Sequence, residues 1–349
     1  MVMTHRLYII ALLCLAGSLL SCRKNTPYRI EYEKSFAEIA QLAADEDKHF
    51  AIVLADPDSF ACRALYIALY YISADEEVIF NVVDITLPQN RWYQQLIQSG
   101  ARPTTLVFSP DAQLKAIIQG ASRSGIDCIA NVLNNNIDCA PFFNSLTFPP
   151  SIPHEDVIRT LNLILTAKQK IESGEDAVEK LEKALNTLYY PFPLWLKMKN
   201  EYNLGYTEDA VLLARQLLTF QDPLYTRLYS DLFLAARKVI NPDFDVATMP
   251  ILEIEIDDVD LGDLLEGSDK RIRIKLRNTG KELLVLHDVN VGCSCLTLLD
   301  VNSEIKPNDG TYLYLLFTAE QSGEVRRNVT ITANTLTPLH TIAVRADVW

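Results

Sequence analysis

The apolar and polar positions divide the chain into four regions with different patterns. The first is a continuous apolar run over residues 7–20, broken only by Gly17 and Ser18 and preceded by His5 and Arg6. Its length of about 14 residues suits the core of a signal peptide and is below the ~20 that a membrane-spanning helix needs. No later segment has an apolar run of spanning length. We therefore expect residues 1–21 to be a signal peptide and residues 22–30 to be an anchor and linker.

Residues 31–148 alternate between strand-type and helix-type apolar spacing. Ser35 and Glu38 have the spacing of a capping box at the start of a helix over residues 35–45. From residue 49 the order is β-α-β-α-β-β-α, which predicts an α/β domain with a mixed sheet and helices on both faces. The expected strands are 49–55, 78–85, 104–108 and 114–119, and the later helices are 62–72, 90–98 and 125–134.

A proline-rich boundary at residues 148–153 precedes a helical region over residues 151–245. Glu175-Asp176-Ala177-Val178 recurs as Glu208-Asp209-Ala210-Val211, a period of 33, and residues 204–210 resemble the turn between tetratricopeptide helices, whose period is 34. Two copies are fewer than the roughly three that such an array needs, so a helical spacer is favoured over a peptide-binding superhelix. The expected helices are 155–172, 177–188, 194–203, 208–220 and 223–239.

Short alternating strands and closely spaced turns fill residues 250–349. About 100 residues of this kind predict an antiparallel β-sandwich. The expected strands are 252–256, 272–276, 283–289, 311–317, 328–332 and 341–348, with turns at 278–280, 308–310 and 322–323. The fold class is therefore multidomain, with α/β, α and all-β parts.

Composition narrows the choice of partners. The 349 residues are 49% hydrophobic and carry a net charge of −13, so phosphate backbones are repelled and nucleic-acid binding is not expected. The chain has seven cysteines. Cys14 lies in the expected signal peptide and Cys22 is the expected anchor residue, so five remain. Five is odd, so at least one thiol stays unpaired within a monomer.

Leu19-Leu20-Ser21-Cys22 resembles the lipobox of bacterial lipoproteins. The resemblance implies diacylglycerol on the Cys22 sulfur, cleavage after Ser21, and a membrane anchor of two or three acyl chains. An uncleaved anchor, or an ordinary secretory signal that ends by chance at a cysteine, are the alternatives. The following Arg23-Lys24-Asn25 lacks an Asp that resembles an inner-membrane retention signal, which favours a cell-envelope protein on the periplasmic face of the outer membrane.

Three segments punctuate residues 31–148: the C-[KR]-x-L pattern at residues 62–65, the Val83-Asp84-Ile85 strand end, and Ala101-Arg102-Pro103-Thr104. With these segments the region resembles a thioredoxin fold over about 115 residues, and Pro103 occupies the place of the family's cis-proline. The resemblance puts Ser59 where the attacking cysteine of C-x-x-C stands, with Cys62 as the second cysteine. It also puts Val53 at the buried carboxylate and Asp58 at the tryptophan. The redox motif is therefore degenerate, and Cys62 is expected to be a buried small hydrophobe.

Cys128 and Cys139 lie 11 residues apart, on and just after the last helix of this domain. They pair in a disulfide if the chain folds back after residues 134–136, and otherwise remain two free thiols.

The C-terminal region carries a series of sequence landmarks: Asp260-Leu261-Gly262, Glu266-Gly267, Asn278-Thr279-Gly280, Val291-Gly292-Cys293-Ser294-Cys295, Ile305-Lys306-Pro307, Gly323 and Asn334. In the order and gaps of these landmarks it resembles the domain of unknown function family 1573, an immunoglobulin-like module without an agreed activity. Ser294 and Leu296 depart from that family's usual glycine and threonine.

Cys293 and Cys295 are the sharpest chemical feature of this region. On a regular strand their Cα atoms would be ~6.6 Å apart with Cβ directions unfavourable for a bond, so a disulfide requires a turn. Three interpretations stand: two structural thiols, a reactive redox pair, or part of a metal site with His287 and His340. Structural thiols are favoured, and neither a metal centre nor a cofactor is expected.

No Ser-His-Asp grouping, phosphate-binding glycine loop or paired-carboxylate motif stands out, so a catalytic role is not favoured. The expected function is a lipid-anchored scaffold that binds envelope proteins. The alternative is an envelope thiol-disulfide oxidoreductase that acts through Cys293 and Cys295.

The lipobox generates a direct test. Replacing Cys22 by alanine removes the sulfur that receives the lipid, so we expect release of the chain from membranes or accumulation of uncleaved precursor. Labelling with radioactive fatty acid and fractionation of cells measure both. A Cys22→Ala variant that still carries lipid and runs at mature size contradicts the assignment.

Overall fold

A computed structural model describes residues 28–56, 59–69, 78–101, 103–133, 148–220 and 222–349. Cys22, Asp58 and Cys139 lie outside these ranges. The chain divides into two compact units, one made of residues 1–94 and 100–158 and the other of residues 95–99 and 159–349. Across the described ranges, no helix is long and apolar enough to cross a membrane.

The first unit contains a five-stranded mixed sheet in the order β1-β3-β2-β4-β5. Strands β1, β3 and β2 are parallel to one another, β4 runs antiparallel to β2, and β5 runs antiparallel to β4. From β2 onward the element order is the expected β-α-β-α-β-β-α, and β1 adds an edge strand that the sequence pattern did not predict. The strands are β1 (Tyr28–Tyr32), β2 (Phe50–Ala55), β3 (Val78–Asp84), β4 (Thr104–Phe108) and β5 (Leu114–Gln119). The helices are α2 (Phe36–Glu46), α3 (Phe60–Leu69), α4 (Arg91–Ile97) and α5 (Arg123–Leu133), with a short 3-10 turn at Pro88–Asn90.

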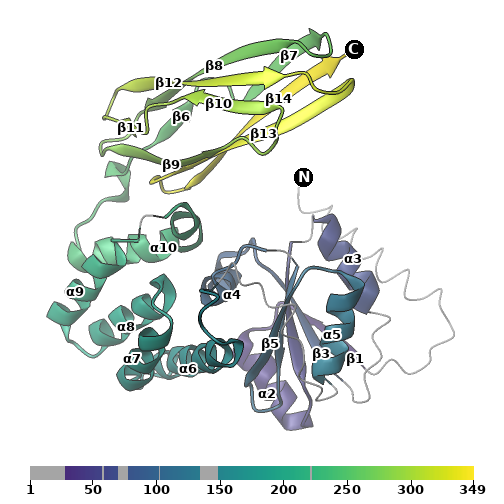
Figure 1. Cartoon of the computed structure of the whole chain (residues 1–349). Coiled ribbons are helices and arrows are strands. Elements are labelled where there is room, and N and C mark those ends of the chain that lie inside the picture. Colours follow the sequence, from purple (N-terminus) through teal and green to yellow (C-terminus); the bar gives the residue numbers. More distant parts are fainter. Residues whose placement is uncertain (1–27, 57–58, 70–77, 102, 134–147, 221) are drawn as a thin grey trace, which may run out of the picture. The chain divides into compact units, whose positions relative to one another are not determined.

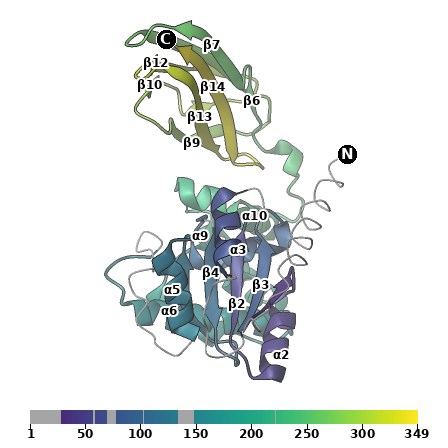
Figure 2. The ribbon, with the colours of Figure 1, turned by 90° about the vertical axis from the view of Figure 1, so that its right-hand side faces the viewer.

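Helices cover both faces of this sheet (Figure 1, Figure 2). On one face, Cys62 and Leu65 of α3 and Ile129 of α5 pack in a core with Val53 and Phe80 of the sheet. On the other face, Phe36 of α2 contacts Trp92 of α4 and the stacked rings of Phe50 and Phe108. Each residue of β2 is therefore buried, without the alternation of a half-exposed strand.

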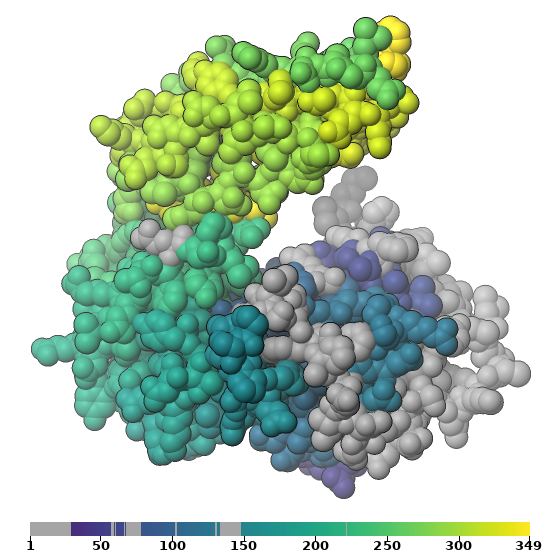
Figure 3. All heavy atoms as spheres, viewed as in Figure 1, coloured from purple at the N-terminus to yellow at the C-terminus, as the bar shows by residue number. Residues whose placement is uncertain are grey.

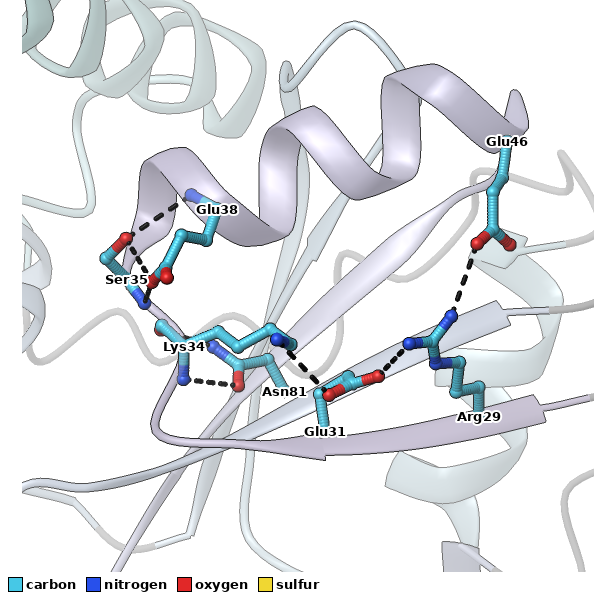
Figure 4. Close-up of polar contacts among 7 residues, drawn as sticks. All are labelled: Arg29, Glu31, Lys34, Ser35, Glu38, Glu46 and Asn81. Carbon is cyan, nitrogen blue, oxygen red and sulfur yellow. Dashed lines mark hydrogen bonds and ion pairs between the residues drawn. The ribbon is translucent and has the colours of Figure 1, made fainter.

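Polar contacts attach the start of α2 to β3, and an ion pair between Arg29 and Glu46 joins β1 to the end of α2 (Figure 4). Ser35 and Glu38 form the expected capping box, with 2.8 Å from the Ser35 N–H to Glu38 Oε2 and 3.3 Å from the Glu38 N–H to Ser35 Oγ. The fully buried Asn81 of β3 bonds both backbone groups of Lys34. The start of α2 is thus fixed by local partners and by a strand from a distant part of the sequence.

Five helices follow, each overlapping an expected one. Gly205, at φ +88°, forms the turn between the third and fourth, where a residue with a side chain would be strained. The helices are α6 (His154–Glu172), α7 (Val178–Thr187), α8 (Pro191–Asn203), α9 (Thr207–Leu217) and α10 (Pro223–Ile240).

Residues 95–99, which include the end of α4, belong to the second unit. The Tyr190 hydroxyl donates to the Leu96 carbonyl at 2.6 Å and the Tyr229 hydroxyl donates to the Gln95 carbonyl at 2.9 Å. The Gln95 side chain in turn donates to the Leu228 carbonyl and to Asp231. These tyrosines satisfy carbonyls that the last turn of a helix leaves without intrahelical partners, and burial raises the pKa of both hydroxyls well above the ordinary value.

The C-terminal part is an all-β domain of two sheets, ordered β10-β12-β8-β6 and β11-β9-β13-β14-β7. It is coloured green to yellow in the views (Figure 1, Figure 3). The inward side chains of both sheets form one apolar core, and every pairing is antiparallel except that of β7 with β14. The strands are β6 (Leu252–Ile254), β7 (Asp258–Leu264), β8 (Asp269–Asn278), β9 (Leu284–Asn290), β10 (Leu296–Asp300), β11 (Glu304–Ile305), β12 (Gly310–Thr318), β13 (Gly323–Ala333) and β14 (Leu339–Val348). The edge strands β7, β10 and β11 were not expected.

Asn278 organises the turn that was expected at residues 278–280. Its buried amide donates to the carbonyls of Glu282 and Ile305 and accepts from the Gly280 N–H at 3.0 Å. A Cβ at Gly280 would lie 2.3 Å from the Met249 carbonyl oxygen, so only glycine fits. The packing of this turn therefore requires Asn278 and Gly280 of the Asn-Thr-Gly landmark.

The tyrosine contacts predict a measurable stability effect. Tyr190→Phe or Tyr229→Phe leaves one buried carbonyl of α4 without its hydroxyl donor, which we expect to lower the free energy of unfolding by about 1–3 kcal/mol. Tyr189→Phe is the matched control, because this side chain is 58% exposed. Urea unfolding of the full chain measures the difference; equal stability of all three variants contradicts a capping role for the two hydroxyls.

Candidate functional site

The thioredoxin-like motif lies at the start of α3. The Ser59 N–H donates to the Asp56 carbonyl at 3.0 Å, and the Ser59 carbonyl accepts from the Arg63 N–H at 3.2 Å, so Ser59 directly precedes the helix. Cys62 is in the first turn and is fully buried. Its sulfur accepts a hydrogen bond from the Asp56 N–H at 3.3 Å.

The other positions of the motif are equally unsuited to thiol exchange. Val53 is fully buried in the apolar core beside Cys62, where a carboxylate would be needed for proton transfer. Pro103 is buried just before β4, and its carbonyl accepts from the Gly120 N–H at 2.8 Å. A serine hydroxyl forms no mixed disulfide, and a fully buried thiol cannot be attacked without unfolding. The described part of the motif therefore offers no reactive thiol.

Cys128 is buried on α5 and is disulfide-bonded. Its expected partner, Cys139, lies outside the described residues, so this pairing stays a prediction.

The sulfur atoms of Cys293 and Cys295 are joined in a disulfide. The sequence pattern favoured two separate thiols at a strand end, and the structure differs because the chain turns here. Gly292 adopts φ +67°, and the Cys293 N–H donates to the Val291 carbonyl at 2.9 Å. This turn brings the two Cα atoms to 5.4 Å, closer than on a regular strand.

The disulfide lies between β9 and β10 with one side toward solvent. Cys293 is half-buried, Cys295 is buried, and Ser294 between them is exposed. The Ser294 hydroxyl donates to the Glu320 carboxylate at 3.0 Å. This hydrogen bond places an acidic group beside the residue that separates the two cysteines.

The two histidines of the C-terminal domain do not join this pair in a metal site. In the described ranges, no group of three or more His, Cys, Asp and Glu side chains is arranged to hold a metal ion. Burial lowers the pKa of both His287 and His340, and His340 Nε2 lies 2.9 Å from the Thr335 hydroxyl. Both imidazole rings are half-buried within the domain.

Residues 252–348 match the family model of "Protein of unknown function (DUF1573)". The resemblance of the C-terminal region to that family is thus confirmed for those residues. The match covers less than half of the chain, and no curated protein matches the sequence.

Solved structures similar to this chain include a protein of unknown function from Porphyromonas gingivalis W83, at 27% identity and TM-score 0.27, over 31% of this chain and 50% of that one. The chain thus spans half the length of that relative. Thioredoxin-like neighbours include a mutant thioredoxin from Halobacterium salinarum NRC-1, at 13% identity and TM-score 0.27, over 34% of this chain and 100% of that one. Another is a yeast mitochondrial 1-Cys peroxiredoxin, at 19% identity and TM-score 0.26, over 30% and 95% of the two chains.

Proposed function

We propose that this chain is a lipid-anchored protein of the cell envelope that binds protein partners and has no thiol chemistry in its N-terminal domain. The observation that carries the proposal is the state of the thioredoxin-like motif. Cys62 is fully buried, and Ser59 stands where an attacking thiolate is needed. The scaffold of the domain is kept without its reactive group, which is the pattern of a binding domain.

The anchor in this proposal is Cys22, in the lipobox-like Leu19-Leu20-Ser21-Cys22, and the residues after it favour the periplasmic face of the outer membrane. The architecture that we propose is a thioredoxin-like domain, a tetratricopeptide-like helical spacer and an immunoglobulin-like β-sandwich. The helix pairs of the spacer and the two-sheet core of the last domain support this description. Such an array presents several surfaces to envelope partners.

The proposal predicts that the full chain does not reduce insulin with dithiothreitol as electron donor, while an ordinary thioredoxin does. Ser59→Cys allows a disulfide with Cys62, because the first turn of α3 sets the spacing of the two residues. Turnover is still expected to stay low, since Val53 provides no carboxylate for proton transfer.

The matched control carries Cys293→Ser and Cys295→Ser in the full chain, so that any activity is assigned to one domain. Clear insulin reduction by this control, with Ser59 unchanged, overturns the proposal.

A second candidate function is an envelope thiol-disulfide oxidoreductase that acts through Cys293 and Cys295. The disulfide between them, with Cys293 half-buried and Ser294 exposed, favours this candidate. The Glu320 carboxylate beside Ser294 counts against it, because reactive thiolates are stabilised by electropositive surroundings.

Replacement of both cysteines by serine separates the two functions. For a structural disulfide that closes so short a loop, we expect a loss of about 1–2 kcal/mol of stability and no loss of partner proteins captured by amine crosslinking in intact cells. Thermal unfolding with and without dithiothreitol measures the first, since reduction at this pair should destabilise only the unsubstituted chain.

Substitution of one cysteine at a time tests for the result that an oxidoreductase would give. In an oxidoreductase, removal of the resolving cysteine leaves the other one joined to its client on a non-reducing gel. A client band that appears with Cys293→Ser or Cys295→Ser alone, and disappears with both, makes the oxidoreductase the better account.

A further inference from the structure

Four cationic side chains follow one another on the outer face of β8. Arg271, Arg273, Lys275 and Arg277 point outward, because the residues between them, Ile272, Ile274 and Leu276, are buried in the core of the domain. Side chains two apart on a strand lie about 6.8 Å from each other, so the four charges form a stripe about 20 Å long. The alternation is visible in the sequence, where it predicted only a strand.

Two exposed tyrosines lie beside this stripe on β12. Tyr312 pairs with Lys275 and Tyr314 with Arg273, so their rings share the outer face with the cations. They are 36% and 38% exposed, and their ring centroids are 6.1 Å apart. The guanidinium carbon of Arg273 lies 4.7 Å from the centre of the Tyr312 ring, a contact that orients the guanidinium without using its N–H groups.

Among the residues that the structure describes, none of the four cations forms an ion pair, although the chain carries a net charge of −13. Elsewhere in the same domain, Arg326 pairs with Glu324 and Arg345 with Asp258. Carboxylates lie along both borders of this face without forming ion pairs with its cations. On the β6 side, Glu253 is opposite Arg277 and the Glu255 N–H donates to the Lys275 carbonyl; on the β10 side, Asp300 is opposite Tyr314. At Arg273 the neighbour on β12 is a tyrosine instead of a carboxylate.

We propose that this outer face, defined as Arg271, Arg273, Lys275, Arg277, Tyr312 and Tyr314, binds an acidic polysaccharide. The C–H faces of sugar rings pack on the two tyrosine rings, and sugar carboxylates accept hydrogen bonds from the guanidinium groups. The charge complementarity and the length of the stripe match an extended polyanion. This ligand goes beyond the protein partners proposed above, and the inference rests on that proposed function only in placing the face at the cell envelope.

A carbohydrate fits this face better than an anionic lipid surface. The tyrosines lie among the cations on the face of a sheet, where they can stack against sugar rings. A membrane-binding face would present protruding apolar side chains that enter the bilayer, and the exposed residues of this stripe are cationic and phenolic.

The experiment measures binding of the full chain to polygalacturonate, with dextran as the uncharged polymer, by isothermal titration calorimetry at two salt concentrations. Arg271→Gln with Arg273→Gln is expected to raise the dissociation constant about tenfold or more. Arg326→Gln with Arg327→Gln is the matched control, because it removes the same charge from exposed positions on β13 and should leave binding unchanged. Tyr312→Leu, which changes no charge, should weaken binding to polygalacturonate.

Three outcomes overturn the proposal. The first is an absence of binding to polygalacturonate, and the second is equal loss in the β8 variant and its β13 control. The third is stronger binding to vesicles of phosphatidylglycerol that depends on Arg271 and Arg273 but not on Tyr312, which assigns the face to lipid. Captured envelope partners that persist in the β8 variant leave the scaffold role intact, so failure of this site and failure of that role are distinguishable.

Discussion

The geometric constraint with the widest consequences here is that successive side chains of a strand point to opposite faces of the sheet. In β2 both faces are covered by helices, so every residue from Phe50 to Ala55 is buried and the strand has no outward side. In β8 only one face is covered. The burial of Ile272, Ile274 and Leu276 therefore places every intervening cation on the opposite, outer face. The covering of one or both faces of a sheet thus buries Val53 in β2 and exposes the cationic stripe of the C-terminal domain.

In the N-terminal domain, Cys62 belongs to the core of the fold. It lies in the first turn of α3, which packs on the mixed sheet. Its sulfur is enclosed in the apolar core and accepts a hydrogen bond from the backbone N–H of Asp56. Packing of the core needs neither a thiol at Ser59 nor a carboxylate at Val53, so the fold tolerates the absence of both. The binding role that we propose for this domain rests on that observation.

Predictions from sequence were most successful where the determining contacts are local. The capping box of Ser35 and Glu38 depends on groups three residues apart, and in the Asn278-Thr279-Gly280 turn the Asn278 side chain accepts from the Gly280 N–H two residues later. Predictions about cysteines were less successful. Regular strand geometry disfavoured a bond between Cys293 and Cys295, whereas the turn at Gly292 brings their Cα atoms to 5.4 Å. The surface that we consider functional was overlooked because Tyr312 and Arg273 are 39 residues apart and meet only through the pairing of β12 with β8.

The sequence by itself determined the order of helices and strands from residue 49 to the end of α10, the division into α/β, helical and all-β regions, and the absence of a cysteine at position 59. These follow from apolar periodicity and residue identity, which are properties of short segments. Only the tertiary structure decided that β1 and β7 join their sheets, that Tyr190 and Tyr229 cap the end of α4, and that the cations of β8 stand beside the tyrosines of β12. Each of these contacts joins residues far apart in the chain. Their formation depends on which surfaces the completed cores bring together, and a local pattern carries no information about that.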